Sequence, residues 1–124
     1  MRIGRYGRAV EILDLRSPGG RPIAAYGSAG LTAEHVLRGA RTAVTVLRVA
    51  AGGEIGRHPA SGDQFFFVVS GRGAVRTGDD AWQPIEPGQA ALWRDGEEHT
   101  TRAAEDLTAL VIEAEEGLGT SRDS

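Results

Sequence analysis

Short segments rich in β-branched and aromatic residues recur along the chain, and residues that favour turns separate them. Apolar positions alternate over a few residues at a time and do not repeat roughly every 3.6 residues, as they would along an amphipathic helix. Many short strands between turns predict an all-β fold, either a sandwich or a barrel.

The predicted strands are bounded by residues that supply turn conformations, such as those at Ala51–Gly53 and Gly78–Asp80. The segment Leu31–Arg38 fits a short helix or a strand, and the pattern leaves both open. Strands are expected at Ala9–Leu15, Ile23–Tyr26, Thr42–Ala50, Gln64–Ser70, Gly73–Thr77, Trp82–Ile85, Ala90–Arg94, His99–Ala103 and Leu107–Ala114.

The apolar run Phe65–Val69 is unusual because both of its faces are hydrophobic. Alternate side chains of a strand point to opposite faces, so Phe66 and Val68 share one face, while Phe65 and Phe67 lie on the other. Both faces then need a cover. One face can line a barrel, and the other needs either a second sheet layer or a second copy of the chain. We expect a homodimer.

Composition narrows the chemistry. The 124-residue chain contains no cysteine, which excludes disulfides and thiolate sites, and all 14 of its basic residues are arginine, which excludes Schiff-base lysines. The basic residues are scattered, so we expect no nucleic-acid partner. No apolar run is long enough to span a membrane, and no secretion signal is seen, so a cytoplasmic protein is expected. Abundant arginine, alanine and glycine suggest a bacterial source.

Residues 52–71 read G-G-E-I-G-R-H-P-A-S-G-D-Q-F-F-F-V-V-S-G. This segment resembles the first motif of the cupin family, G-x5-H-x-H-x3–4-E-x6-G. Gly52, His58 and Gly71 match motif positions. Ala60 stands where the family has its second histidine, and Gln64 stands where it has glutamate.

Residues 88–103 read G-Q-A-A-L-W-R-D-G-E-E-H-T-T-R-A. They resemble the second cupin motif, G-x5-P-x-G-x2-H-x3-N. Gly88, Gly96 and His99 match, whereas Arg94 replaces the proline and Ala103 replaces the asparagine. Together the two segments resemble a small single-domain bacterial cupin with degenerate metal motifs.

The resemblance implies a single cupin domain over residues 1–116, an all-β barrel of the jelly-roll type, also called a double-stranded β-helix. Residues 117–124 are polar and small, and we expect them to form a disordered tail.

In cupins, the motif histidines and glutamate bind a divalent transition metal inside the barrel. By resemblance, His58, His99 and Gln64 are the expected metal ligands, and the two histidines are also the expected catalytic residues. The metal would be Fe, Ni, Mn, Zn or Cu. All three ligands are neutral, which weakens metal binding, so a metal-free site is the alternative. The rest of the pocket is expected to consist of Ala60, Phe66, Val68, Thr101 and Arg94.

The predicted function is binding of a small organic ligand. One hypothesis is an enzyme of small-molecule metabolism, secondary metabolism included, with dioxygenase, isomerase, cyclase or lyase chemistry. Without metal, His58 or His99 could act as general acid or base. The alternative is a ligand-binding or sensing cupin that has lost its metal. His35 and Tyr26 are interpreted as ordinary surface or core residues, and Trp82 and Trp93 as core or interface aromatics.

Overall fold

The computed structural model describes residues 10–16 and 19–120. Within these ranges the chain forms nine strands and one short 3-10 turn, η1. The elements are β1 (Arg21–Ile23), η1 (Ala25–Gly27), β2 (Ala29–Arg38), β3 (Thr42–Pro59), β4 (Asp63–Ser70), β5 (Gly73–Thr77), β6 (Gln83–Ile85), β7 (Ala90–Trp93), β8 (Glu98–Ala103) and β9 (Leu107–Ala114).

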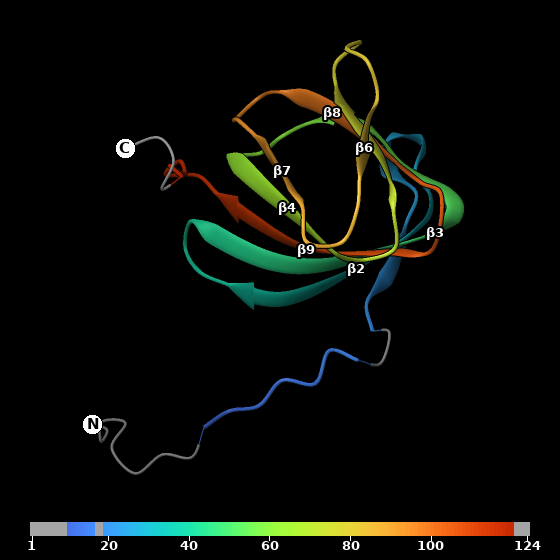
Figure 1. Cartoon of the computed structure of the whole chain (residues 1–124). Helices are drawn as coiled ribbons and strands as arrows, with labels where there is room; N and C mark the ends of the chain where they lie inside the picture. The colour runs from blue at the N-terminus through green and yellow to red at the C-terminus, as the bar shows by residue number, and fades with distance from the viewer. Residues whose placement is uncertain (1–9, 17–18, 121–124) are drawn as a thin grey trace.

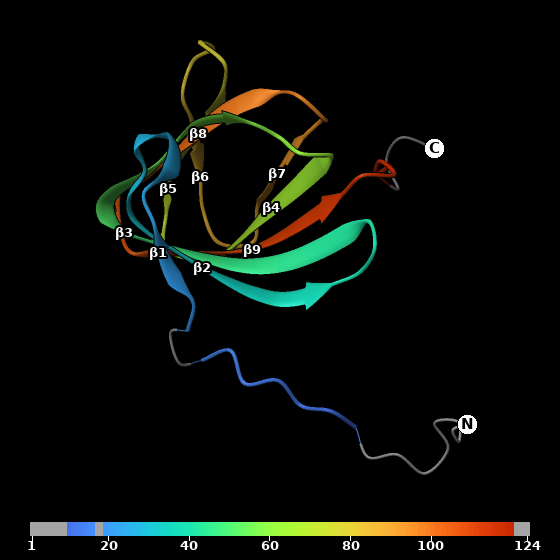
Figure 2. The same cartoon turned by 180° about the vertical axis from the view of Figure 1, so that it is seen from behind.

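The strands form one antiparallel sheet in the order β6-β5-β8-β3-β9-β4-β7, with β2 also paired to β3, and β1 to β2. Figures 1 and 2 show this sheet curving around one axis into a nearly closed barrel. The predicted all-β barrel is therefore confirmed. Among the described residues, no helix is long and apolar enough to cross a membrane.

The long strand β3 positions the site, because its first half pairs with β2 and β9 and its second half with β8. The turn predicted at Ala51–Gly53 is wrong, since β3 continues through these residues. Gly52 adopts a φ of 80°, and a side chain at Gly53 would collide with the Ala29 carbonyl oxygen. The glycines thus bend the strand around the barrel rather than ending it.

Several predicted strands are found at or near their expected bounds. Gly73–Thr77 and Leu107–Ala114 form β5 and β9 as predicted, and Leu31–Arg38 belongs to a strand, not a helix. Only the first residue of the predicted strand Ile23–Tyr26 is extended, because η1 follows it.

The predicted N-terminal strand is not formed. Ala9 lies outside the described residues, and residues 10–15 pair with no strand. Val10 and Ile12 are 80% and 83% exposed, and Figure 1 shows residues 10–16, in blue, running away from the barrel. The segment has strand-like composition but lies beside no sheet edge of its own chain, so composition alone does not make it a strand.

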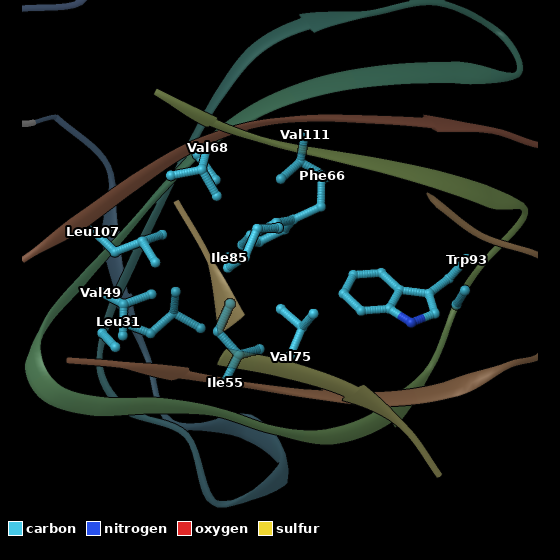
Figure 3. Packing of buried hydrophobic residues seen from close by; sticks show 13 residues of the cluster. Leu31, Val49, Ile55, Phe66, Val68, Val75, Ile85, Trp93, Leu107 and Val111 are labelled. Carbon is cyan, nitrogen blue, oxygen red and sulfur yellow. The ribbon is translucent and has the colours of Figure 1, made fainter. Parts of the chain in front are cut away.

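The hydrophobic core fills the barrel interior. Figure 3 shows Phe66 and Val68 of β4 pointing into the same space as Ile55 and Val75 from other strands. Phe66 and Val68 are fully buried, whereas Phe65 and Phe67 on the opposite face of β4 are half-buried. The alternation predicted from the sequence therefore holds.

The start of the expected tail contacts the barrel. The carboxylate of Asp63 accepts a hydrogen bond from the Leu118 backbone amide at 2.9 Å. The Arg94 guanidinium donates to the Leu118 carbonyl oxygen and also to Asp63. Residues 121–124 lie outside the described residues.

Candidate functional site

His58 of β3 and His99 of β8 lie directly opposite each other in the sheet register. Their ring centroids are 4.3 Å apart, with the ring planes inclined by 54°. The antiparallel pairing of β3 and β8 thus brings together two histidines that are far apart in sequence, as the motif resemblance predicted.

The backbone selects the tautomer of both rings. His58 donates a hydrogen bond through Nδ1 to the Gly56 carbonyl oxygen at 2.8 Å, and His99 donates through Nδ1 to the Glu97 carbonyl oxygen at 3.0 Å. A carbonyl oxygen only accepts, so each Nδ1 carries the proton. In the neutral rings each Nε2 therefore holds a lone pair that can accept a proton or a hydrogen bond.

His99 is sealed into the interior. Its ring is 1% exposed and stacks on the indole of Trp93, with centroids 4.1 Å apart. Burial, with a smaller contribution from the nearby His58, lowers the pKa of His99 to about 4. Its Nε2 atom is buried without a hydrogen-bond partner. His99 is thus held as a neutral imidazole.

A pocket of about 350 Å³ opens beside His58. Its walls are largely aliphatic, and its polar groups include Tyr26, His35, Thr45, Gln64 and Glu113. The pocket is lined by Ile23, Ala25, Tyr26, Ser28, Leu31, Ala33, His35, Thr45, Leu47, Ile55, His58, Gln64, Val111 and Glu113.

Glu113 of β9 places a carboxyl group in this largely apolar pocket. Burial raises the pKa of Glu113, while His58, His35 and Arg38 oppose that rise. A carboxyl with a raised pKa exchanges its proton closer to neutral pH than an exposed one does. The pocket therefore combines a titratable acid, Glu113, with an imidazole lone pair, that of His58.

Among the pocket residues that sequence reasoning missed, three have titratable side chains: Tyr26, His35 and Glu113. Strand alternation could have found Glu113, because it shares a face of β9 with the buried residues Ala109 and Val111. His35 enters through the pairing of β2 with β3, where its Nδ1 lies 3.1 Å from the Thr45 hydroxyl. No local pattern in the sequence indicates Tyr26.

The other predicted pocket residues do not line this pocket. Ala60, Phe66 and Val68 belong to the buried hydrophobic cluster, and Thr101 is also buried. Phe66 packs its ring edge-on toward Trp93 at 6.0 Å. Arg94 lies outside the barrel interior, where it forms an ion pair with Asp63 at 2.9 Å. Strand alternation placed the four buried residues inside but could not separate core from cavity.

The donor set does not fit a resident divalent metal. The Nε2 lone pairs of His58 and His99 are of the right kind, and the unpartnered Nε2 of His99 is available. However, within residues 10–16 and 19–120 no third histidine, aspartate, glutamate or cysteine joins them in a group that could hold a metal. Two imidazoles and the Gln64 amide would leave a dication uncompensated in a buried site.

Comparison with known proteins settles the family. A family model described as a cupin domain matches residues 45–114, which is more than half of the chain. The chain belongs to the cupin domain family. The matched part of this cupin contains β4 to β9 and most of β3. No curated protein matches the chain significantly.

Solved structures share this fold at low sequence identity. A cupin-like protein from Thermotoga maritima is 17% identical, with a TM-score of 0.74, covering 86% of this chain and 85% of that chain. A predicted oxalate decarboxylase from the same species is 19% identical, with a TM-score of 0.65 over 72% and 84% of the two chains. The DMSP lyase DddQ from Ruegeria pomeroyi is 18% identical, with a TM-score of 0.63 over 68% and 46%. These likenesses show the fold alone.

Proposed function

We propose that this cupin binds a small organic molecule in the pocket beside His58 and transfers a proton on it. The observation that carries the proposal is the placement of Glu113, His58 and Gln64 in one largely apolar pocket. Such pockets combine apolar walls, which exclude water from the ligand, with a few polar groups that orient it.

The chemistry follows from the two titratable groups that share the pocket. The His58 Nε2 lone pair can accept a proton, and the Glu113 carboxyl, whose pKa burial raises, keeps its proton to a higher pH than an exposed carboxyl and can donate it. Pairs of groups in different environments commonly divide the acid and base roles. His99 is sealed and neutral, so its role is to orient His58 by ring contact.

A second, polar hollow that borders Glu113 favours a ligand that has both an apolar body and a polar end. A smaller hollow of about 110 Å³ also borders Glu113, and its lining includes Arg38 and Arg41. The apolar body would occupy the pocket among Leu31 and Ile55, and the polar end would face the two arginines.

We infer that the pocket works without a resident metal, because the donor set lacks a third ligand and an anionic ligand. The likeness to the DMSP lyase DddQ from Ruegeria pomeroyi, at 18% identity, supports the fold only, so the proposal rests on the pocket itself.

The binding claim is tested by a fragment screen with protein-observed NMR. Fragments that bind should shift the resonances of the Gln64 side-chain amide and of the residues around His58. Ala33→Leu adds three carbons inside the pocket and should weaken the binding of these fragments, whereas the matched Ala90→Leu adds the same volume at the exposed first residue of β7 and should not. Fragments that bind both variants equally would contradict the proposed site.

A second experiment separates an enzyme from a non-catalytic binding protein. The loss of half the metal-motif side chains favours the binding protein. Pocket fragments with a C–H next to a carbonyl are incubated in D2O, and deuterium incorporation at that carbon is followed by NMR. Base catalysis removes the proton, and solvent returns a deuteron. Exchange that disappears in Glu113→Gln supports proton transfer, whereas binding with no exchange above the buffer rate would leave a binding protein.

A further inference from the structure

We propose that Tyr26 controls access to His58, and that its ring is held over the imidazole by a left-handed backbone conformation at a position where the fold does not need a tyrosine for its own stability. The proposal deepens the proposed function, because it names a specificity-determining residue at the mouth of the same pocket. The turn η1 that carries Tyr26 lies against β3, near the bend at which that strand curves around the barrel (Figure 2).

The backbone of Tyr26 is exceptional in this chain. Among the described residues it is the one non-glycine residue with a positive φ, 59°, which lies in the left-handed region. A large side chain rarely adopts this conformation, because its Cβ atom crowds the following backbone. Glycine or asparagine would occupy the position with less strain, so the aromatic side chain needs another reason.

The surrounding contacts force Tyr26 into this conformation. Gly56 of β3 packs so closely that a Cβ atom there would overlap the Tyr26 carbonyl oxygen. The Gly56 amide donates to the Ser28 hydroxyl at 2.9 Å, and the Ser28 amide donates back to the Ala25 carbonyl oxygen at 3.1 Å. The turn is therefore closed across Tyr26 by its own backbone and fastened to β3 through Ser28.

The same glycine also orients His58, since the Gly56 carbonyl oxygen accepts the hydrogen bond from His58 Nδ1. Gly56 thus links the strained turn to the imidazole. The result is that the Tyr26 ring stacks on His58, with centroids 5.1 Å apart and planes inclined by 23°.

The exposure of the Tyr26 ring argues against a simple packing role. Tyr26 is 65% exposed and lines the pocket, whereas His58 beneath it is half-buried. A ring that covers an imidazole yet remains open to solvent on its other side makes up part of a pocket mouth, not of a core. Strain held by the surrounding structure at such a position is typical of functional residues.

The test uses diethyl pyrocarbonate, which acylates unprotonated imidazole nitrogen, with each histidine followed by mass spectrometry. Tyr26→Gly suits the left-handed backbone but removes the ring, and Tyr26→Phe retains the ring. We expect His58 to react several-fold faster in Tyr26→Gly than in wild type, and at the wild-type rate in Tyr26→Phe. His35, which is exposed, is the internal reference, and the sealed His99 reports on intact folding.

Two further measurements separate function from structure. The urea midpoint of Tyr26→Gly should equal or exceed that of wild type, because strain is relieved. Its affinity for the tightest pocket fragment should fall about three- to tenfold, the range expected for one aromatic contact.

Unchanged His58 reactivity in Tyr26→Gly would overturn the proposal and make the ring a packing element. If the urea midpoint falls and His99 becomes reactive, Tyr26→Asn, which also tolerates a left-handed backbone, decides by the same His58 readout. If no fragment binds wild type, the proposed function fails, while the acylation rates still decide the role of Tyr26.

Discussion

Lowering the pH from 7 to 5 is expected to destabilise the fold, and His99 is the principal cause. The buried imidazole has a pKa of about 4, whereas an imidazole in the unfolded chain titrates near 6.5. Between these values the unfolded chain binds a proton that the native state does not. The free energy of unfolding is therefore unaffected by His99 above about pH 6.5, and it decreases as the pH falls from 6.5 toward 4.

The size of the effect follows from the two pKa values. Proton linkage gives a loss of about 2 kcal/mol in the free energy of unfolding between pH 7 and pH 5. Glu113 acts in the opposite direction, because its raised pKa means that acid stabilises the native state. The wild-type curve is thus shallower than His99 alone would make it.

The assay is urea unfolding followed by tryptophan fluorescence, because Trp93 stacks directly on His99 and is 3% exposed. A loss of about 2 kcal/mol corresponds to a midpoint shift of about 1–2 M urea. The control is His99→Asn, whose amide can donate to the Glu97 carbonyl oxygen in place of Nδ1 but does not titrate. The variant will be less stable at every pH, yet its midpoint should depend less on pH. Equal pH dependence in both proteins would refute the assignment to His99.

Three more outcomes are expected. Protein purified without added metal should contain substoichiometric Fe, Ni, Mn, Zn and Cu, and a chelator should leave its urea midpoint unchanged. If the purified protein holds one equivalent of a metal, and if a chelator removes that metal and lowers the urea midpoint, the donor-set argument is contradicted. Asp63→Asn should lower the stability of the protein and flatten the dependence of stability on acid. Hydrogen bonds from Leu118, Asp95 and Arg94 hold the pKa of the Asp63 carboxyl below its usual value, so the stabilisation that this carboxylate gives is lost as acid protonates it. An unchanged acid midpoint of unfolding would count against this. Light scattering at micromolar concentration should give twice the 13.1 kDa chain mass, and Phe67→Glu on the outer face of β4 should halve it, whereas a wild-type mass near 13.1 kDa would rule out the homodimer.

The sequence predicted the barrel because the relevant signals are local. Alternation defined β5 and β9, and the two motif segments supplied the histidines that the pairing of β3 with β8 sets opposite each other. The same local signals failed where tertiary context decides the outcome. Gly52 and Gly53 resemble a turn but bend a continuous strand, since the neighbouring strand β2 supplies pairing on both sides of the bend.

The pocket was harder to predict than the fold. Alternation assigns Phe66 and Glu113 alike to the interior, but only the packing shows that Phe66 fills core and Glu113 lines a cavity. The position of Tyr26 in the pocket could not be predicted from the sequence, because its left-handed backbone results from the close approach of Gly56, which lies 30 residues further along the chain.

The central claim is that the ligand lies among His58, Gln64 and Glu113 inside the barrel. The most direct measurement is a crystal structure of the protein with the tightest fragment from the screen. We predict density for the fragment in the pocket of about 350 Å³, within hydrogen-bond distance of His58 Nε2 or the Glu113 carboxyl. Density only outside the barrel, for example in the groove beside Phe65 and Phe67, with an empty pocket at His58, would contradict the account.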